Sequence, residues 1–120
     1  MTPTEAVIHS LNMLLERHKD DIAQANQVNI GLNPKFGHGD DIWIRTEKIH
    51  VVAEVTITGS ERTENMPLGT RRMKLDAKVR KLVDRSGVTH KYLIVPANCA
   101  ASYGQRKGLE DVEVLFLSSG

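Results

Sequence analysis

Apolar and polar residues alternate with a period of two along residues 40–58, the most regular pattern in the chain. Such alternation predicts β-strands with one buried face. The polar pair Glu47-Lys48 interrupts the apolar positions and predicts a tight turn, so that the segment forms a hairpin. A four-residue turn centred there sets Asp41 directly opposite Glu54, whereas a three-residue turn would set Asp40 opposite Glu54 instead.

The residues before this hairpin show first a helical and then an extended pattern. Apolar residues follow helical spacing from about Pro3 to Gln24, and Thr2-Pro3 has the composition of a helix start. Alternation from Val28 to Leu32 predicts a strand, and the glycines and proline of residues 33–39 predict a loop.

After the hairpin, polar residues 59–69 predict a loop, and helical spacing returns from Thr70 to Arg85. The apolar positions of this second helix, which we expect to face the core, are Leu75, Val79, Leu82 and Val83. The remaining patterns predict a strand over residues 91–95, a short helix over 97–106 and a strand over 112–117.

The order of these elements is α-β-β-β-α-β-α-β. Strands joined through a helix lie parallel with right-handed crossovers, whereas the strands of a hairpin are antiparallel. The sequence therefore predicts an α/β fold with a central mixed sheet flanked by helices. A chain of 120 residues suits one core, so we assign residues 1–120 to a single domain.

The overall charge indicates no partner, because 16 Lys and Arg residues are balanced by 15 Asp and Glu residues. The single cysteine, Cys99, excludes an internal disulfide and is typical of a reducing compartment. The sequence shows no apolar run long enough for a membrane span and no secretory signal. We therefore expect a cytoplasmic protein without a membrane partner.

The two acids that the hairpin brings together are the strongest candidates for chemistry. Cross-strand partners have Cβ atoms roughly 5 Å apart, and two carboxylates at that distance repel each other unless a cation lies between them. Asp41 and Glu54 therefore predict a divalent cation site, and ordinary solvated acids on an exposed face are the alternative. Glu54 lies within a mostly apolar strand, where an unpaired charge is costly, which favours the functional interpretation.

The helix expected over residues 70–85 is rich in positive charge. Its basic residues outnumber its two acidic residues, Asp76 and Asp84. They are Arg71, Arg72, Lys74, Lys78, Arg80, Lys81 and Arg85. A basic helix beside the acids would hold a phosphate backbone, and a solvated surface is an equally good interpretation.

The order of elements and the two acids together resemble the PD-(D/E)XK, or restriction-endonuclease-like, nucleases. Those proteins have an Asp before the apolar residues of the second strand, and residues 39–44 (Gly-Asp-Asp-Ile-Trp-Ile) are similar. Their third strand ends in Glu-x-Lys, and residues 51–56 (Val-Val-Ala-Glu-Val-Thr) are similar up to the last position. The chain departs from the family there, because Thr56 stands in place of the lysine.

This resemblance implies a restriction-endonuclease-like core and a metal-dependent endonuclease that hydrolyses DNA phosphodiester bonds. Asp41, Glu54 and the carbonyl of Val55 would hold Mg²⁺ or Mn²⁺, and Lys74 or Lys78 would replace the missing lysine. Contacts to the DNA backbone are expected from Lys35, Arg71, Arg72 and Lys81. A homodimer would bring one site to each strand of the DNA.

Two further interpretations stay open, and Thr56 favours the first of them. A relative that has lost catalysis would keep the fold as a nucleic-acid- or protein-binding module, and salt-dependent DNA binding without metal dependence would select it. A small α/β interaction domain without a nucleic-acid role would bind neither DNA nor metal.

Overall fold

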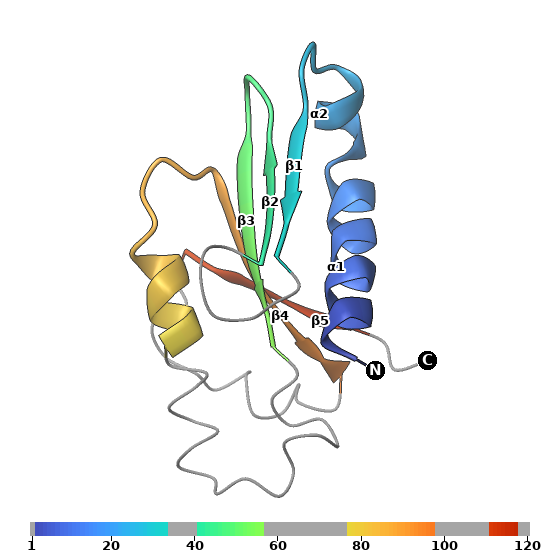
Figure 1. Ribbon diagram of the computed structural model, residues 1–120. Coiled ribbons are helices and arrows are strands. Elements are labelled where there is room, and N and C mark those ends of the chain that lie inside the picture. The colour runs from blue at the N-terminus through green and yellow to red at the C-terminus, as the bar shows by residue number, and fades with distance from the viewer. Residues whose placement is uncertain (1, 34–40, 57–76, 98–110, 118–120) are drawn as a thin grey trace, which may run out of the picture.

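The sheet at the centre of the protein is built from β1 (Asn29–Leu32), β2 (Ile42–Arg45), β3 (His50–Val55), β4 (His90–Pro96) and β5 (Glu113–Leu117). The computed structural model of the chain describes residues 2–33, 41–56, 77–97 and 111–117, and the five strands are those of this part. They lie in the order β1-β2-β3-β4-β5 (Figure 1). The β1-β2 and β2-β3 pairs are antiparallel, and the β3-β4 and β4-β5 pairs are parallel. The prediction of an α/β fold with a mixed sheet is therefore confirmed.

The register of the β2-β3 hairpin follows the predicted four-residue turn. Ile42 pairs with Ala53, and the same register carried one residue outward sets Asp41 opposite Glu54. Thr46 stabilises the turn, because its Oγ1 accepts hydrogen bonds from the N–H groups two and three residues further along, at 3.1 and 3.0 Å. The alternative three-residue turn is excluded.

The N-terminal helix is shorter than predicted. Helix α1 spans Pro3–Arg17, and a separate short helix, α2, spans Lys19–Ala23. Thr2 caps α1 as expected, since its side chain accepts a hydrogen bond from the N–H of Glu5 at 3.1 Å. The backbone leaves helical geometry at His18, where φ is −109° and ψ is 20°. The prediction of one continuous helix is wrong, because apolar spacing continues across this break although the backbone does not.

Apolar side chains form one layer on each face of the sheet. Helix α1 packs on one face, and helical residues 77–83 pack on the other (Figure 1). The α1 layer contains Ala6, Val7, Leu14, Ile42, Ile44, Ile49, Val51, Ala53, Val55, Tyr92, Ile94 and Leu117. The opposite layer contains Val52, Val79, Leu82, Leu93, Val95 and Val112. Strand β3 supplies residues to both layers, which accounts for its nearly continuous burial.

The second helix is confirmed in its described part, with one error in its core-facing side. Val79 and Leu82 are buried as predicted, but Val83 is 41% exposed, so the prediction that it faces the core is wrong. Helical geometry ends at residue 83, two residues before the predicted end. The rest of this helix, the loop over 59–69, residues 98–106 of the short third helix and Cys99 lie outside the described residues. None of the helices in the described ranges combines the length and apolar character that crossing a membrane requires.

Candidate functional site

Asp41 and Glu54 are buried on the sheet face that helical residues 77–83 cover. Their exposed fractions are 2% and 1%. Glu54 belongs to β3, and Asp41 directly precedes β2. Because side chains alternate along a strand, Glu54 shares the face of Val52, and Asp41 shares the face of Trp43. The interpretation of the two acids as solvated surface groups is therefore wrong.

Lys78 reaches from helical residues 77–83 into the space between the two acids and the end of β3. Its Nζ donates hydrogen bonds to Oδ2 of Asp41 at 3.1 Å and to the carbonyl of Val55 at 2.9 Å. The same Nζ lies 3.6 Å from Oε2 of Glu54, an ion pair. We call these three oxygen atoms the oxygen cage. They belong to the three groups that the resemblance assigns to a metal ion.

The backbone of neighbouring strands holds Asp41 in place. The N–H of Val55 donates to Oδ2 of Asp41 at 2.8 Å, and the same oxygen accepts from Lys78. The backbone carbonyl of Asp41 accepts from the N–H of Asn33 at 2.8 Å, just beyond the end of β1. Hydrogen bonds to an ionised carboxylate are among the stronger ones in proteins. The carboxylate of Asp41 is therefore oriented before any ligand binds.

Lys81 pairs with the remaining oxygen of Glu54. Its Nζ lies 2.5 Å from Oε1, and 36% of the Lys81 side chain is exposed. This contact is an ion pair at hydrogen-bonding distance, so each carboxylate oxygen of Glu54 lies beside a lysine ammonium group. Lys78 and Lys81 are three residues apart and project from one side of the helix. That spacing is the sequence signal for the pairing of Lys81 with the acids, and the contact of Lys81 to nucleic acid stays a prediction.

The environment of Glu54 changes its acidity. Burial and, after it, the neighbouring Asp41 carboxyl group raise the pKa of Glu54 from its ordinary value of 4.5 to about 7. Burial has this effect because it removes the water that stabilises the charged form. Lys81 and Lys78 act in the opposite direction. Glu54 therefore exchanges its proton near neutral pH when no further cation is bound.

Thr56 stands where the nuclease family described above carries its lysine. Its side chain is buried, with 3% exposed, and its N–H donates to the carbonyl of Ile94 at 3.0 Å. Alternation along β3 sets Thr56 on the same face as Glu54. A threonine hydroxyl carries no charge, so the positive charge at the acids comes, within the described residues, from Lys78 and Lys81.

Four of the predicted site residues lie outside the described residues. They are Lys35, Arg71, Arg72 and Lys74. Phosphate contacts by Lys35, Arg71 and Arg72, and a catalytic role for Lys74, therefore stay predictions.

Among the described residues, the site offers a cation only oxygen ligands. Within the described ranges, no three His, Cys, Asp or Glu side chains lie close enough together to form a metal site. A cation here would therefore take the carboxylates of Asp41 and Glu54 and the carbonyl of Val55, with water completing its coordination. Such a donor set fits Mg²⁺ and Mn²⁺, which accept carboxylate, carbonyl and water oxygens. It does not suit Zn²⁺, which prefers His and Cys.

A second group of polar side chains lies on the α1 face of the sheet. Nε2 of His18 and the hydroxyl of Tyr92 are 2.7 Å apart, and the ring of His90 lies 4.6 Å from that of His18. Arg17 pairs with Glu113 at 2.5 Å and lies over the ring of Tyr92. We call these five residues the histidine–tyrosine cluster. The sequence does not predict this cluster, because its bonded members are 74 and 96 positions apart and no local pattern joins them.

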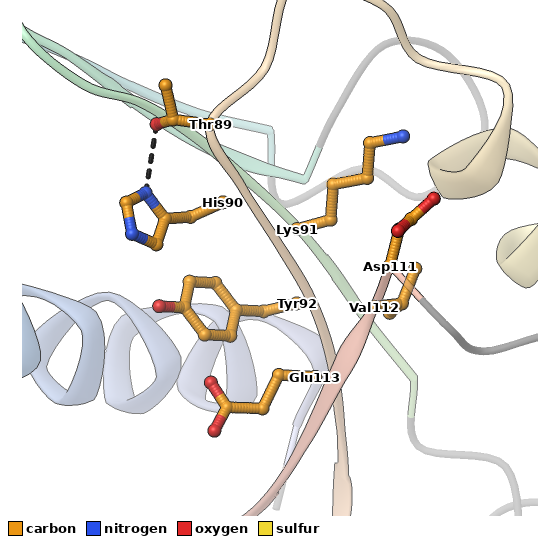
Figure 2. A pocket seen from close by; sticks show the side chains of 7 residues that line it. All are labelled: Thr89, His90, Lys91, Tyr92, Asp111, Val112 and Glu113. Atoms are coloured by element: carbon orange, nitrogen blue, oxygen red, sulfur yellow. Dashed lines mark hydrogen bonds between the residues drawn. The ribbon is translucent and has the colours of Figure 1, made fainter.

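A hollow of about 400 Å³ lies beside the histidine–tyrosine cluster (Figure 2). Its lining residues are Thr89, His90, Lys91, Tyr92, Asp111, Val112 and Glu113. Figure 2 shows Tyr92 and Glu113 on one side of β4 and Lys91 on the other. The ammonium of Lys91 donates to the carbonyl of Val83 at 3.0 Å. The lining includes no member of the oxygen cage, so this hollow is a separate feature of the molecule.

Comparison with known proteins gives no family for this chain. No protein-family model matches the sequence, and neither curated proteins nor solved structures include a significant match. The function is therefore inferred from the geometry of the oxygen cage and its two lysines.

Proposed function

We propose that the protein is a metal-dependent endonuclease that hydrolyses DNA phosphodiester bonds at Asp41 and Glu54. The observation that carries this proposal is the convergence of two buried carboxylates and one backbone carbonyl on a single point, where an ammonium group lies. Burying two acids side by side costs stability, and the raised pKa of Glu54 is a sign of that cost. Perturbed acids of this kind are concentrated at functional sites, which favours chemistry over packing.

The residues of the site fall into two groups: one would hold a cation, and the other would bind a phosphate. Asp41, Glu54 and the carbonyl of Val55 would hold the cation. When bound, Mg²⁺ would lower the pKa of a coordinated water and offset the charge that develops on the phosphate. Lys78 and Lys81 each carry three N–H donors and a positive charge for the phosphate oxygens. In this proposal the helix supplies the positive charge that Thr56 lacks.

Incubation of supercoiled plasmid with the protein and Mg²⁺ or Mn²⁺ tests the proposal. We expect nicked and then linear DNA with the wild-type protein. Glu54→Gln should reduce the nicking rate by about 100-fold or more, because the amide carries no charge to hold the cation. The matched control is Glu113→Gln, which changes an exposed acid on the other face and should keep the wild-type rate. Absence of nicking by the wild-type protein with both metals, or equal nicking by Glu54→Gln, would reject the proposal.

A homodimer belongs to the same proposal. One copy of the chain has one oxygen cage among its described residues, whereas cleavage of duplex DNA requires attack on both strands. Light scattering on the purified protein measures its mass in solution. If the protein is a monomer and produces only nicked circles, the dimer hypothesis is rejected and the nuclease hypothesis is retained.

A binding module without catalysis is the second candidate. The observation that favours it is that Lys78 already bonds to the oxygens that a metal would need. The oxygen cage and Lys78 therefore form a buried ionic network without a metal. Such a module would bind DNA with an affinity that falls as salt rises and that is unchanged by a chelator. Measuring the affinity for DNA at several salt concentrations, with Mg²⁺ and with a chelator, separates the two candidates.

A further inference from the structure

The ammonium group of Lys78 lies in the space that a divalent cation would use. Its Nζ is 2.9, 3.1 and 3.6 Å from the three oxygen atoms of the cage. Such distances suit an ammonium group, whereas Mg²⁺ lies roughly 2.0–2.1 Å from its oxygen ligands. A divalent ion that draws the same oxygens inward leaves no room for Nζ among them, and the two positive charges repel each other.

Among the described residues, the Lys78 side chain has a route from the cage toward solvent. Its side chain is 23% exposed, so it enters the site from the solvent side. The helix that carries it is anchored by Val79 and Leu82, which are 9% and 0% exposed. A lysine side chain is a flexible four-carbon stem with rotatable bonds. Rotation of this stem therefore carries the ammonium group toward solvent.

The exchange of cations changes the charge of the site in a direction that suits a phosphate. When Glu54 is ionised, the carboxylates of Asp41 and Glu54 are balanced by the ammonium groups of Lys78 and Lys81. A divalent ion in the place of Lys78 adds one positive charge to the cage, while Lys81 stays with Glu54. A phosphodiester carries one negative charge and offsets that surplus, and the displaced ammonium group stays within reach as a further donor.

We propose that Lys78 and a divalent cation are alternative occupants of the oxygen cage, so that metal binding expels the Lys78 ammonium group toward the substrate phosphate. Lys78 acts here as an internal competitor that keeps the two acids paired until the metal arrives. The role toward the phosphate rests on the nuclease function proposed above, whereas the competition requires only that metal binds.

Calorimetry or the paramagnetic resonance of free Mn²⁺ measures the competition directly on the full chain, without DNA. Lys78→Met removes the competing charge and keeps the length of the side chain. We expect it to bind Mn²⁺ about tenfold more tightly, because the wild-type cage is available only for the fraction of time that Lys78 is out of it. Lys81→Met is the matched control on the same helix, and its affinity should change by less than about threefold, because Lys81 pairs with Oε1 outside the cage.

Each outcome of this experiment decides one question. Equal affinity of Lys78→Met and the wild-type protein overturns the competition, and so do equal gains in both lysine variants, which would reflect charge alone. Mn²⁺ binding by none of the proteins rejects the competition and the nuclease together. Tighter binding by Lys78→Met, with no plasmid nicking by the wild-type protein, keeps the competition and rejects the nuclease.

A measurement on the wild-type protein covers the case in which Lys78→Met does not fold. The side-chain NMR signals of Lys78 and Lys81 are followed as Mg²⁺ is added. The signal of Lys78 should move to the position of a solvated lysine as the cage fills, while that of Lys81 changes little. A Lys78 signal that is unchanged at saturating Mg²⁺ overturns the competition.

Discussion

The two faces of the sheet bury polar groups in different ways. On the face of helical residues 77–83, Asp41 and Glu54 bury carboxylates, which are balanced by the ammonium groups of Lys78 and Lys81. On the α1 face, His18 and Tyr92 are also buried, but they satisfy each other across 2.7 Å without needing a charge. A satisfied neutral pair holds α1 against β4, whereas the burial of acids opposes folding.

In both the oxygen cage and the histidine–tyrosine cluster, burial disfavours the charged form of a side chain. The resulting pKa shifts have opposite signs, because one group is an acid and the other is a base. Burial first, and then the charge of His90, lowers the pKa of His18 below 6.5. Burial raises the pKa of Glu54 to about 7. The histidine–tyrosine cluster is therefore most stable where His18 is neutral, and the oxygen cage without metal is most stable where Glu54 is neutral.

The largest expected difference between the two clusters is in activity. Asp41→Asn should lower the plasmid-nicking rate by about 100-fold or more, because it removes a charge from the oxygen cage. Tyr92→Phe removes only a hydroxyl on the opposite face and should keep the wild-type rate. Initial rates with Mn²⁺ check both variants. A comparable loss in Tyr92→Phe would mean that the two clusters act together.

The next largest effect is the opposite pH dependence of stability. The folded protein keeps a proton on Glu54 that the unfolded chain loses between pH 4.5 and about 7. The free energy of unfolding of the metal-free protein should therefore lose about 3 kcal/mol from Glu54 as the pH rises through that range. His18 has the opposite effect on stability, because its side chain binds a proton more readily in the unfolded chain than in the folded protein. The contribution of His18 to the free energy of unfolding therefore falls as the pH drops below 6.5.

Urea denaturation in a chelator between pH 4.5 and 8 separates these two contributions. Glu54→Gln should remove the loss of stability that accompanies a rise in pH from 4.5 to about 7, and should keep the decline that His18 causes as the pH falls below 6.5. If the stability of the wild-type protein and of Glu54→Gln followed parallel curves, Glu54 would not titrate as its burial implies.

Removal of one cation from the oxygen cage should have a smaller effect on stability. Lys78→Met at pH 8 leaves the two carboxylates less well balanced and should lower the free energy of unfolding by about 2 kcal/mol, less than for a fully buried pair because Lys78 is partly exposed. Mn²⁺ should restore this loss by taking the same place. Urea denaturation with and without Mn²⁺ measures both changes, and a variant as stable as the wild-type protein without metal would contradict the ionic role of Lys78.

A single hydrogen bond of the histidine–tyrosine cluster contributes less again. Tyr92→Phe should lower the free energy of unfolding by about 1 kcal/mol, because it leaves a ring nitrogen of buried His18 unpaired. Its Mn²⁺ affinity should equal that of the wild-type protein. Denaturation and calorimetry on the same sample test both statements, and an altered affinity would connect the two faces.

The smallest expected effect belongs to the ion pair at the edge of the same cluster. The side chains of Arg17 and Glu113 are 44% and 48% exposed. A double-mutant cycle with Arg17→Ala and Glu113→Ala should give a coupling energy below about 1 kcal/mol, and high salt should reduce it. A larger, salt-independent value would show that this pair is an integral part of how α1 docks.

The local features of the fold could be predicted from the sequence. The register of the hairpin follows from a period-two pattern and a short turn, both of which are set by neighbouring residues. The break at His18 could not be predicted, because its side chain is buried against Tyr92, 74 positions away. Val83 was placed in the core for a similar reason, since helical spacing alone does not tell how the helix is rotated on the sheet.

The sequence by itself determined that Asp40 or Asp41 faces Glu54 across a hairpin and that a basic helix follows the hairpin. Only the tertiary structure decided that both acids are buried, that Lys78 enters the oxygen cage and that Lys81 pairs with Glu54. The physical reason is the range of the interactions. Hairpin pairing depends on residues that are close along the chain. Which lysine reaches the acids depends instead on how the helix packs on the sheet, and Lys78 is 23 positions from Val55 in the sequence.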